Sequence, residues 1–568
     1  MIQLRTHGLF SALVVAGLLM TSCAAAAPTG NVPAAAPTDT PAAEAAAPTG
    51  PFTPTNYEAP DCNYGGEMKK IEAVDELTVK FTLCQPDPAF LSKIAFVSNN
   101  IQDADYLEAT GGTGDLIEKP NGTGPYKLSE WRRGDQVILT RNDEYWGDKA
   151  IVPNLIFRWG TESAQRLVEL QAGTVDGISS VGADDFETVK SDSNLQLLEL
   201  ASSNVFYLGM NNTYPPFDNE KVRQAFAMAI DRDRLVKNFY PPASSVAKEF
   251  MPPSIYGYTG QVDWYKYDPE QAKKILTEEG VLPGFKTTIT YRDVVRGYLP
   301  SPSTIAQDLQ AQLADIGVEA EIVVMESGAF LDAASAGQLD GFHMLGWGAD
   351  YPDATNFLDV HFGPGASKQF GTGFQDIWDV LKQAGTTADQ AARLPLYSKA
   401  NELIKQHVPM IPIAHGGNAD AFKADVEGAY DPQAGAIHFA LLKPGERDTF
   451  VWMQNAEPIS MFCGDETDGE TLGLCEQFGE SLMAYKPGGN GAVIPSLATE
   501  YSSNADLTEW TFTLRPGVKF HNGASLDAND VVVTFAMQWD VKHPLHKGRS
   551  GDFTYFSSLF GPLLNAPK

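Results

Sequence analysis

Hydrophobic positions recur with helical spacing in two segments near the middle of the chain. Residues 220–235 place apolar side chains on one helical face, and Asp218 or Asn219 precedes them as a candidate N-cap. Residues 303–316 carry a second apolar stripe, which ends at Gly317, a residue type that commonly ends helices. The stripes consist of Val222, Ala225, Phe226, Ala229 and Ile230 in the first segment and Ile305, Leu309, Leu313 and Ile316 in the second.

Strand patterns follow the second of these helices. Residues 318–325 alternate between apolar and polar positions, which predicts a strand, and residues 328–336 predict a further helix. Residues 341–347 predict another strand, which runs into the polar loop 348–357. This alternation of strands and helices predicts α/β lobes. Ligands in α/β folds bind where strands end and loops begin, so the loop 348–357 is a candidate binding segment.

Length, composition and charge limit the class of protein. A chain of 568 residues is too long for one hydrophobic core, so we expect two or three lobes. With 43% hydrophobic and 10% aromatic residues it can bury large cores. The net charge of −31 repels nucleic acid and anionic lipid, so we exclude both as partners; the charge itself is explained by solubility.

The first residues predict export. Arg5 and His7 precede an apolar run at 9–20, which is too short for a membrane span and suits a signal peptide over residues 1–22. Small residues lead to Cys23, and this resembles a bacterial lipoprotein signal, in which the cysteine becomes the lipidated first residue. The alternative is an ordinary secretory signal that is cleaved among the following alanines.

Residues 23–55 predict a spacer and not a folded domain. They are almost wholly Ala, Pro, Thr and Gly, which bury little surface, and proline keeps such a segment extended. No later segment offers 18 consecutive apolar residues. We therefore expect a folded body outside the cytoplasm, attached to the cell membrane only through the lipid anchor.

The four remaining cysteines predict disulfides. An even number in an exported protein favours pairing, with Cys463 and Cys475 close in sequence and Cys62 and Cys84 as a second candidate pair. Four cysteines allow three pairings, among which spacing alone does not choose. No pair is separated by two residues, so we expect no zinc or redox site.

Five stretches then line up with one protein family. They lie at 120–147, 164–178, 210–235, 346–358 and 507–535, and they include the sequences GTGPY, LQAGTVDG, RQAFAMAIDRDRL, GWGADYPDATNF and LRPGVKFHNG. Together they resemble the family-5 extracellular solute-binding proteins of ABC transporters, which include dipeptide-, oligopeptide- and nickel-binding members. The resemblance covers nearly everything after residue 56.

The resemblance implies a periplasmic-binding-protein-like α/β clamp, in which two main lobes close on a ligand and a smaller extra lobe is attached. It implies a monomer that needs no cofactor and catalyses nothing itself. It would capture a short peptide or another small solute and deliver it to an ABC permease, whose ATPase subunits hydrolyse ATP. Two alternatives stay open: an oligosaccharide as the ligand, and a tethered sensor in place of a transporter component.

The order of the five stretches differs from the family. The LRPGVKFHNG stretch normally precedes GTGPY, whereas here it follows every other block. Residues 445–568 followed by 56–444 would restore the usual order, so the chain resembles a circularly permuted member. The alternative is a misassembled tandem gene. The expected parts are 56–149 and 486–568 for the small lobe, 150–265 and 441–485 for the first main lobe, and 266–440 for the second main lobe.

Asp350 is the leading candidate ligand-binding residue. It matches the family's aspartate that pairs with the α-amino group of a peptide, and a buried ammonium requires such a carboxylate partner. The alternative is that Asp350 only stabilises its own turn, a role that we expect for Asp353. Trp347 is either a pocket wall or a core residue beneath the loop, and Tyr351 is a candidate pocket aromatic.

Two further charged residues complete the expected site. Arg296 resembles the arginine that grips the ligand carboxylate through a bidentate guanidinium; Arg292 is a rival, and a surface ion pair is the alternative role. Glu457 resembles an acid that lines the cleft, with a solvated surface acid as the alternative. Tyr298 is a weaker aromatic candidate.

Metal binding and catalysis have little support in the sequence. Scattered histidines, among them His343, His361, His407 and His415, lack metal-ligand spacing, so we expect no metal site. The sequences typical of a nucleophile elbow, a zinc protease helix and a phosphate-binding loop are also missing. We therefore expect a binding protein and not an enzyme.

Overall fold

The computed structural model describes residues 52–489 and 491–567. The predicted signal peptide, Cys23 and nearly all of the predicted spacer lie outside the described residues. The described residues cluster into one compact unit. Within the described part, no helix combines the length and the apolar character that crossing a membrane requires.

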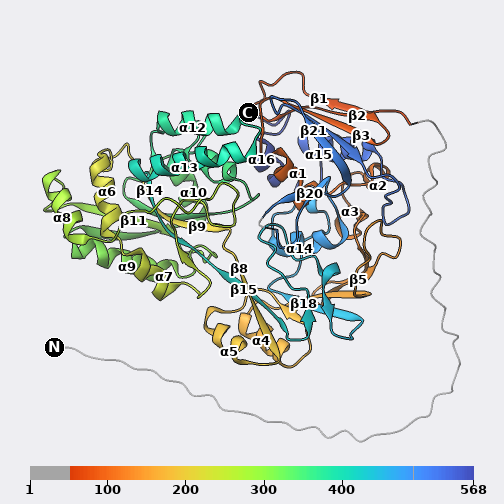
Figure 1. Ribbon diagram of the computed structural model, residues 1–568, viewed down its shortest axis with the longest axis horizontal. Helices are drawn as coiled ribbons and strands as arrows, with labels where there is room; N and C mark the ends of the chain where they lie inside the picture. Colours follow the sequence, from red (N-terminus) through yellow and green to blue (C-terminus); the bar gives the residue numbers. More distant parts are fainter. Residues whose placement is uncertain (1–51, 490, 568) are drawn as a thin grey trace, which may run out of the picture. The chain divides into compact units, whose positions relative to one another are not determined.

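One sheet has seven strands, and its centre is assembled from distant parts of the sequence (Figure 1). β18 runs parallel to both β6 and β7, although about 270 or more residues separate it from either in sequence. Helices α4 (Ser163–Gln171) and α5 (Phe186–Ser191) belong to this lobe. In spatial order the strands are β4 (Tyr126–Arg132), β5 (Gln136–Arg141), β6 (Asn154–Trp159), β18 (Thr449–Gln454), β7 (Gly177–Ile178), β15 (Asn418–Lys423) and β8 (Leu195–Leu200).

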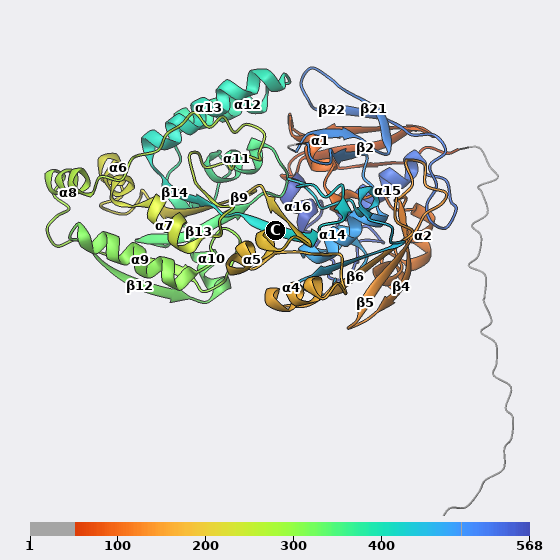
Figure 2. The same cartoon turned by 60° about the horizontal axis from the view of Figure 1, so that its bottom comes forward.

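The second sheet has six strands and its own hydrophobic core. In spatial order these are β10 (Ser245–Val246), β14 (Met410–His415), β9 (Asn204–Met210), β13 (Phe342–Gly348), β11 (Lys286–Arg292) and β12 (Glu319–Met325). Its helices are α6 (Glu220–Ala229), α7 (Arg232–Phe239), α8 (Pro269–Glu278), α9 (Pro302–Asp315), α10 (Ser327–Ser335), α11 (Leu358–Phe362), α12 (Gln375–Gly385) and α13 (Gln390–His407). Figures 1 and 2 show α12 and α13 on one side of this sheet and α9 on the other.

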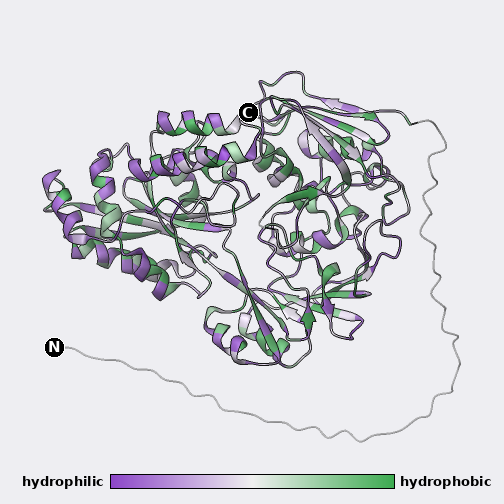
Figure 3. Ribbon diagram, in the orientation of Figure 1, coloured by the Kyte–Doolittle hydropathy of each residue, from purple (hydrophilic) through white to green (hydrophobic). Residues whose placement is uncertain are grey.

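The periodic segments of this lobe fold largely as their patterns predict. The stripe at 303–316 forms α9, and Asn219 caps α6 by accepting a hydrogen bond from the Lys221 amide at 2.9 Å. The predicted helix 220–235 instead forms two helices, because the chain is extended at Ile230 and Asp231 then caps α7. Figure 3 shows both hydrophilic and hydrophobic residues on these helices, as expected where one face packs on a sheet.

The third sheet joins the two ends of the described chain. In spatial order its strands are β1 (Asn56–Glu58), β2 (Met68–Asp75), β3 (Thr78–Leu83), β22 (Glu509–Leu514) and β21 (Ala498–Ser503). β22 pairs antiparallel with β3, and α15 (Ala528–Trp539) packs against β2 behind a capping box made by Asp527 and Asp530. This sheet and much of the seven-stranded sheet share one hydrophobic core.

The remaining elements are short. They are helices α1 (Phe90–Ile94), α2 (Ala104–Thr110), α3 (Asp115–Glu118), α14 (Gly469–Phe478) and α16 (Thr554–Phe560), and the two-stranded sheets β16 (Val426–Glu427) with β17 (Lys443–Pro444) and β19 (Met483–Tyr485) with β20 (Val493–Pro495). Two disulfides join Cys62 to Cys84 and Cys463 to Cys475.

Three segments lie in a different sheet from the one expected. β4 and β5 belong to the seven-stranded sheet and not to the small lobe, and β15 also joins the seven-stranded sheet. β9 and β10 belong to the six-stranded sheet, so the first main lobe does not extend to residue 265. Alternating polarity identifies a strand but carries no information about its neighbours, which is why these boundaries were wrong.

Two short connections link the seven-stranded and six-stranded sheets. Residues 201–203 lead from β8 to β9, and residues 416–417 lead from β14 to β15. Asn204 ties them together, since its side chain donates to the Gly416 carbonyl at 2.8 Å and accepts from the Gly416 amide at 2.9 Å. Short paired connections of this kind suit a hinge between two lobes.

Candidate ligand-binding cleft

Three cavities adjoin one another around Gly435. The large cavity has a volume of about 540 Å³, the Asp350 cavity about 200 Å³ and the Asp420 cavity about 270 Å³, and Gly435 lines all three. Its φ of 70° lies in the left-handed region that glycine adopts without strain. The Asp350 cavity combines residues of the loop after β13 with residues 433–436 and residues of α14, so it lies between the six-stranded lobe and the remainder.

Asp350 is held in the Asp350 cavity by its own loop. The Asn356 side chain donates to Asp350 Oδ2 at 3.0 Å and accepts from the Asp350 amide at 2.9 Å. Ser558 on α16 donates to the same Oδ2 at 3.5 Å. Burial raises the pKa of Asp350, whereas these donors lower it. Among the described residues, the Asp350 carboxylate therefore has hydrogen-bond donors but forms no ion pair.

The neighbouring aspartate has a structural role. Asp353 accepts from the Thr355 amide at 3.0 Å and pairs with the guanidinium of Arg393 at 2.9 and 3.1 Å. Arg393 is fully buried on α13, so this bidentate pair anchors the loop to the helix.

The two aromatic candidates lie in different places. Tyr351 lines the Asp350 cavity, and its hydroxyl accepts a hydrogen bond from Thr355 Oγ1 at 3.2 Å. Trp347 packs among the core residues beneath the loop, where its indole donates to Asn356 Oδ1 at 3.2 Å and meets the His361 ring edge-on at 4.9 Å. Trp347 therefore supports the loop and does not form a wall of the three cavities.

The remaining two candidates also lie outside these cavities. Arg296 is exposed, and its guanidinium donates to the Val295 carbonyl at 3.0 Å. Its rival Arg292 donates to Ser327 and to the Tyr298 hydroxyl. Glu457 accepts from the Trp131 indole at 3.1 Å and from the Gly134 amide, which fastens it to the turn between β4 and β5.

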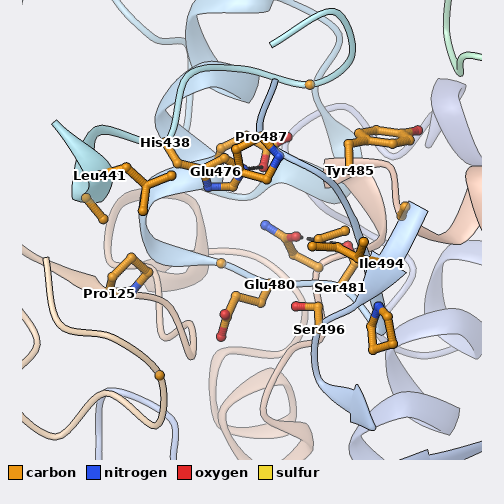
Figure 4. A pocket seen from close by; sticks show the side chains of 18 of the residues that line it. Pro125, His438, Leu441, Glu476, Glu480, Ser481, Tyr485, Pro487, Ile494 and Ser496 are labelled. Carbon is orange, nitrogen blue, oxygen red and sulfur yellow. Dashed lines mark hydrogen bonds and ion pairs between the residues drawn. The ribbon is translucent and has the colours of Figure 1, made fainter. Parts of the chain in front are cut away.

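Two acids of the cleft escaped the sequence analysis. Glu476 lies in the last turn of α14 and Glu480 follows that helix, and both line the large cavity (Figure 4). Burial raises the pKa of Glu476 to about 8 and also raises that of Glu480. The available signal was that Glu476 follows the apolar residues Leu472 and Cys475, both of which are buried. Acids are rarely buried beside such residues, so an acid in this position is a candidate for a functional role.

The histidines considered as metal ligands have structural surroundings. His343, His361 and His415 are buried, and burial lowers the pKa of each to about 4. His407 instead contacts Glu220 at 2.6 Å and Asp376 at 2.9 Å near the surface. Within residues 52–489 and 491–567, no three His, Cys, Asp or Glu side chains come together as a metal site would require.

Two α/β lobes joined by a paired connection, with an acid-containing cavity between them, define a clamp-type binding protein. Comparison with known families identifies it further, because residues 25–369 and 492–553 match the "Bacterial extracellular solute-binding proteins, family 5 Middle". The chain belongs to this family, whose members are transport binding proteins and not enzymes.

Individual relatives agree with this assignment. The chain is 32% identical over 400 residues to di/tripeptide-binding protein 1 of Pseudomonas aeruginosa, covering 69% of this chain and 72% of that protein. The structure of HbpA2 from Haemophilus parasuis is 31% identical, with a TM-score of 0.62 over 65% of this chain and 74% of that one. The binding protein DppA from Helicobacter pylori, in complex with the peptide STSA, is 31% identical with a TM-score of 0.52, covering 64% and 72%.

Proposed function

We propose that this protein captures short peptides in the Asp350 cavity outside the cytoplasm and delivers them to an ABC permease. The observation that carries the proposal is the placement of Asp350, an oriented and largely buried carboxylate between two lobes. A peptide α-ammonium would supply the ion-pair partner that the described residues do not give this carboxylate. Relatives named for di- and tripeptide binding support the same class of ligand.

Binding would be favoured because the Asp350 carboxylate is already held in position and gains an ion-pair partner from the ligand. Asn356 already fixes the position of the Asp350 carboxylate, so little orientational freedom is lost when a ligand ammonium arrives. An ammonium beside Asp350 favours the ionised form and thereby counters the upward pKa shift that burial causes. Closure about residues 201–203 and 416–417 would then bury the pair.

The other expected contacts stay predictions. Arg296 is proposed to meet the carboxylate end of the ligand, which requires its side chain to leave the Val295 carbonyl. Trp347 and Glu457 are proposed to act only indirectly, since both are held by neighbouring side chains or turns. Lipidation at Cys23 is a further proposal, and it would tether the protein beside its permease.

We also propose that the chain is a circular permutation of the family's usual order. Segments from both ends of the described chain lie together, because β22 pairs with β3 and the Glu67 amide donates to the Phe560 carbonyl at 2.7 Å. In the family's usual order these two segments would be consecutive, so a permuted chain is expected to keep them close together. A linear alignment follows only one segment order, which is consistent with coverage of 72% of the Pseudomonas relative.

The test is a thermal-shift and calorimetric screen of the chain carrying Cys23→Ser, which prevents lipidation. Di- to pentapeptides, oligosaccharides and nickel would be compared with the parent protein, with Asp350→Asn and with Asp143→Asn as an exposed control. A ligand at 100 times its Kd stabilises the folded state by about 2.7 kcal/mol. We expect a peptide shift that Asp350→Asn abolishes and Asp143→Asn retains.

Other outcomes would overturn the proposal. Stabilisation by oligosaccharides alone, or peptide binding that is unchanged in Asp350→Asn, would refute the assigned site. A sensor in place of a transporter component would bind peptide equally well but would not support peptide uptake through a reconstituted permease.

A further inference from the structure

We propose that the large cavity is a specificity pocket for a positively charged side chain, with Glu476 as the carboxylate that receives it. The preferred ligand is then a short peptide with lysine or arginine close to its amino end. This inference rests on the proposed peptide-binding function and names the class of peptide.

The two cavities adjoin at Glu476. Ala434, Gly435 and Glu476 line both the large cavity and the Asp350 cavity. A Cβ atom at Gly435 would lie 2.9 Å from Glu476 Oε1, so the missing side chain leaves the carboxylate open at this junction. A peptide whose ammonium pairs with Asp350 can therefore direct a neighbouring side chain past Gly435 into the large cavity.

Glu476 differs from Glu480 in its hydrogen bonding. Glu480 accepts from the Tyr145 hydroxyl at 2.7 Å, the Trp146 indole at 2.9 Å and the Thr123 hydroxyl at 2.8 Å. Among the described residues, the ion-pair contact of Glu476 is with His438, whose Nε2 lies 3.8 Å from Glu476 Oε2. Figure 4 shows Glu476 next to His438, with Glu480 apart from them between Pro125 and Ser496.

His438 does not neutralise Glu476. Burial lowers the pKa of His438 to about 4, so the imidazole is uncharged near neutral pH. The Glu476 side chain is only 14% exposed, and an unpaired carboxylate at that depth is costly. A ligand ammonium or guanidinium that enters the cavity provides the missing partner and favours the ionised acid.

The lining of both cavities favours a cation. Asp148, Asp350, Glu476 and Glu480 contribute carboxyl groups, whereas the described lining residues include neither lysine nor arginine. Arg515 stacks on the Trp146 ring at 4.2 Å without lining the cavity. Leu441, Ile494 and Tyr485 offer apolar surface, which suits the methylene stem of a lysine or arginine side chain. An acidic side chain would instead meet other carboxyl groups, which repel it when they are ionised.

The experiment is isothermal titration calorimetry on the chain with Cys23→Ser. The ligands are Lys-Ala, Ala-Lys, Ala-Ala, Ala-Glu and spermidine, and the variants are Glu476→Gln and the exposed control Glu108→Gln. We expect at least one lysine dipeptide to bind about tenfold or more tightly than Ala-Ala, as a charge-assisted hydrogen bond implies. Glu476→Gln should remove this preference, so that neither lysine dipeptide binds more tightly than Ala-Ala to the variant, and Glu108→Gln should retain it.

Each contrary result has a distinct meaning. Equal affinity for Ala-Ala and both lysine dipeptides, or a preference that survives in Glu476→Gln, overturns the cation pocket while peptide binding stands. Tighter binding of spermidine than of every dipeptide overturns the peptide ligand proposed for this pocket. Absence of binding by all four dipeptides, together with no response to the longer peptides of the thermal-shift screen, overturns the proposed function, and the inference falls with it. Absence of dipeptide binding alone, with longer peptides binding, overturns the preference for a cation close to the amino end of a dipeptide.

Discussion

Asn356 holds Asp350 at two points, donating to its carboxylate at 3.0 Å and accepting from its amide at 2.9 Å. The same Asn356 oxygen accepts from the Trp347 indole at 3.2 Å. One buried amide thus connects the proposed ligand-binding carboxylate to the core beneath the loop. The orientation of Asp350 depends on a residue that the ligand need not touch.

Asn356→Ala is expected to weaken peptide binding about tenfold and to lower the free energy of unfolding by about 1–3 kcal/mol, because it leaves buried donors unpaired. Calorimetry and urea denaturation would measure the two effects. Asn194→Ala removes an exposed turn amide and serves as the control, for which neither quantity should change appreciably. Full peptide affinity in Asn356→Ala would show that Asp350 needs no such support.

Arg393→Met is expected to lower the free energy of unfolding by about 3–5 kcal/mol, because it leaves Asp353 buried without its bidentate partner. The double variant Asp353→Ala/Arg393→Met removes both charges and should recover part of this loss. Urea denaturation at neutral pH measures both. If the single and double variants were equally destabilised, packing and not the unpaired charge would explain the loss.

Asp359 should make stability depend on pH. Burial, and then repulsion from Asp353, raise its pKa to about 7, while Arg393 and Lys93 lower it and Asp87 raises it. The folded state therefore keeps its proton up to about pH 7, whereas an unfolded aspartate ionises near pH 4. Between these values the folded state binds more protons, so this group lowers the stability of the protein as pH rises.

Asp359→Asn removes that titration. Relative to the parent protein, its free energy of unfolding should increase between about pH 4 and pH 7, by up to about 4 kcal/mol. Urea denaturation of both proteins at several pH values measures the difference. A difference that stays constant over this range would mean that Asp359 does not titrate as its surroundings indicate.

A chain in which residues 445–568 precede residues 56–444 should fold and bind the same ligands. The connection from the Phe560 region to the Glu67 region is short in space, and new ends near residue 445 replace a surface segment. We expect a Tm within a few degrees of the parent and unchanged peptide affinity.

The control for this rearrangement is a chain whose new ends fall inside β9, a buried central strand, and it should fail to fold. Failure of the first rearranged chain, with correct folding of the parent, would count against the proposed permutation.

Local structure followed closely from sequence periodicity. The stripe ending at Ile316 forms α9, the alternating residues 318–325 form β12 to within a residue, and Asn219 caps α6. Spacing of apolar positions decides which face of an element is buried, and this information is local. The family motifs identified the class of fold and placed Asp350 in the loop after β13.

The cleft itself required tertiary structure. Glu476 lies beside His438 and Gly435, which precede it by about 40 residues. Tyr145 and Trp146, from a remote segment, donate hydrogen bonds to Glu480 and not to Glu476. Arg296 and Glu457 carry the expected charges, yet neighbouring backbone and side chains hold them outside the cavities. Whether a charged group is satisfied by the protein or left for a ligand depends on contacts made in three dimensions. The sequence by itself therefore determined much of the secondary structure, the family and the position of Asp350 in a loop after a strand. Packing between distant segments decided how that acid is oriented and which acids form no ion pair with lysine or arginine among the described residues.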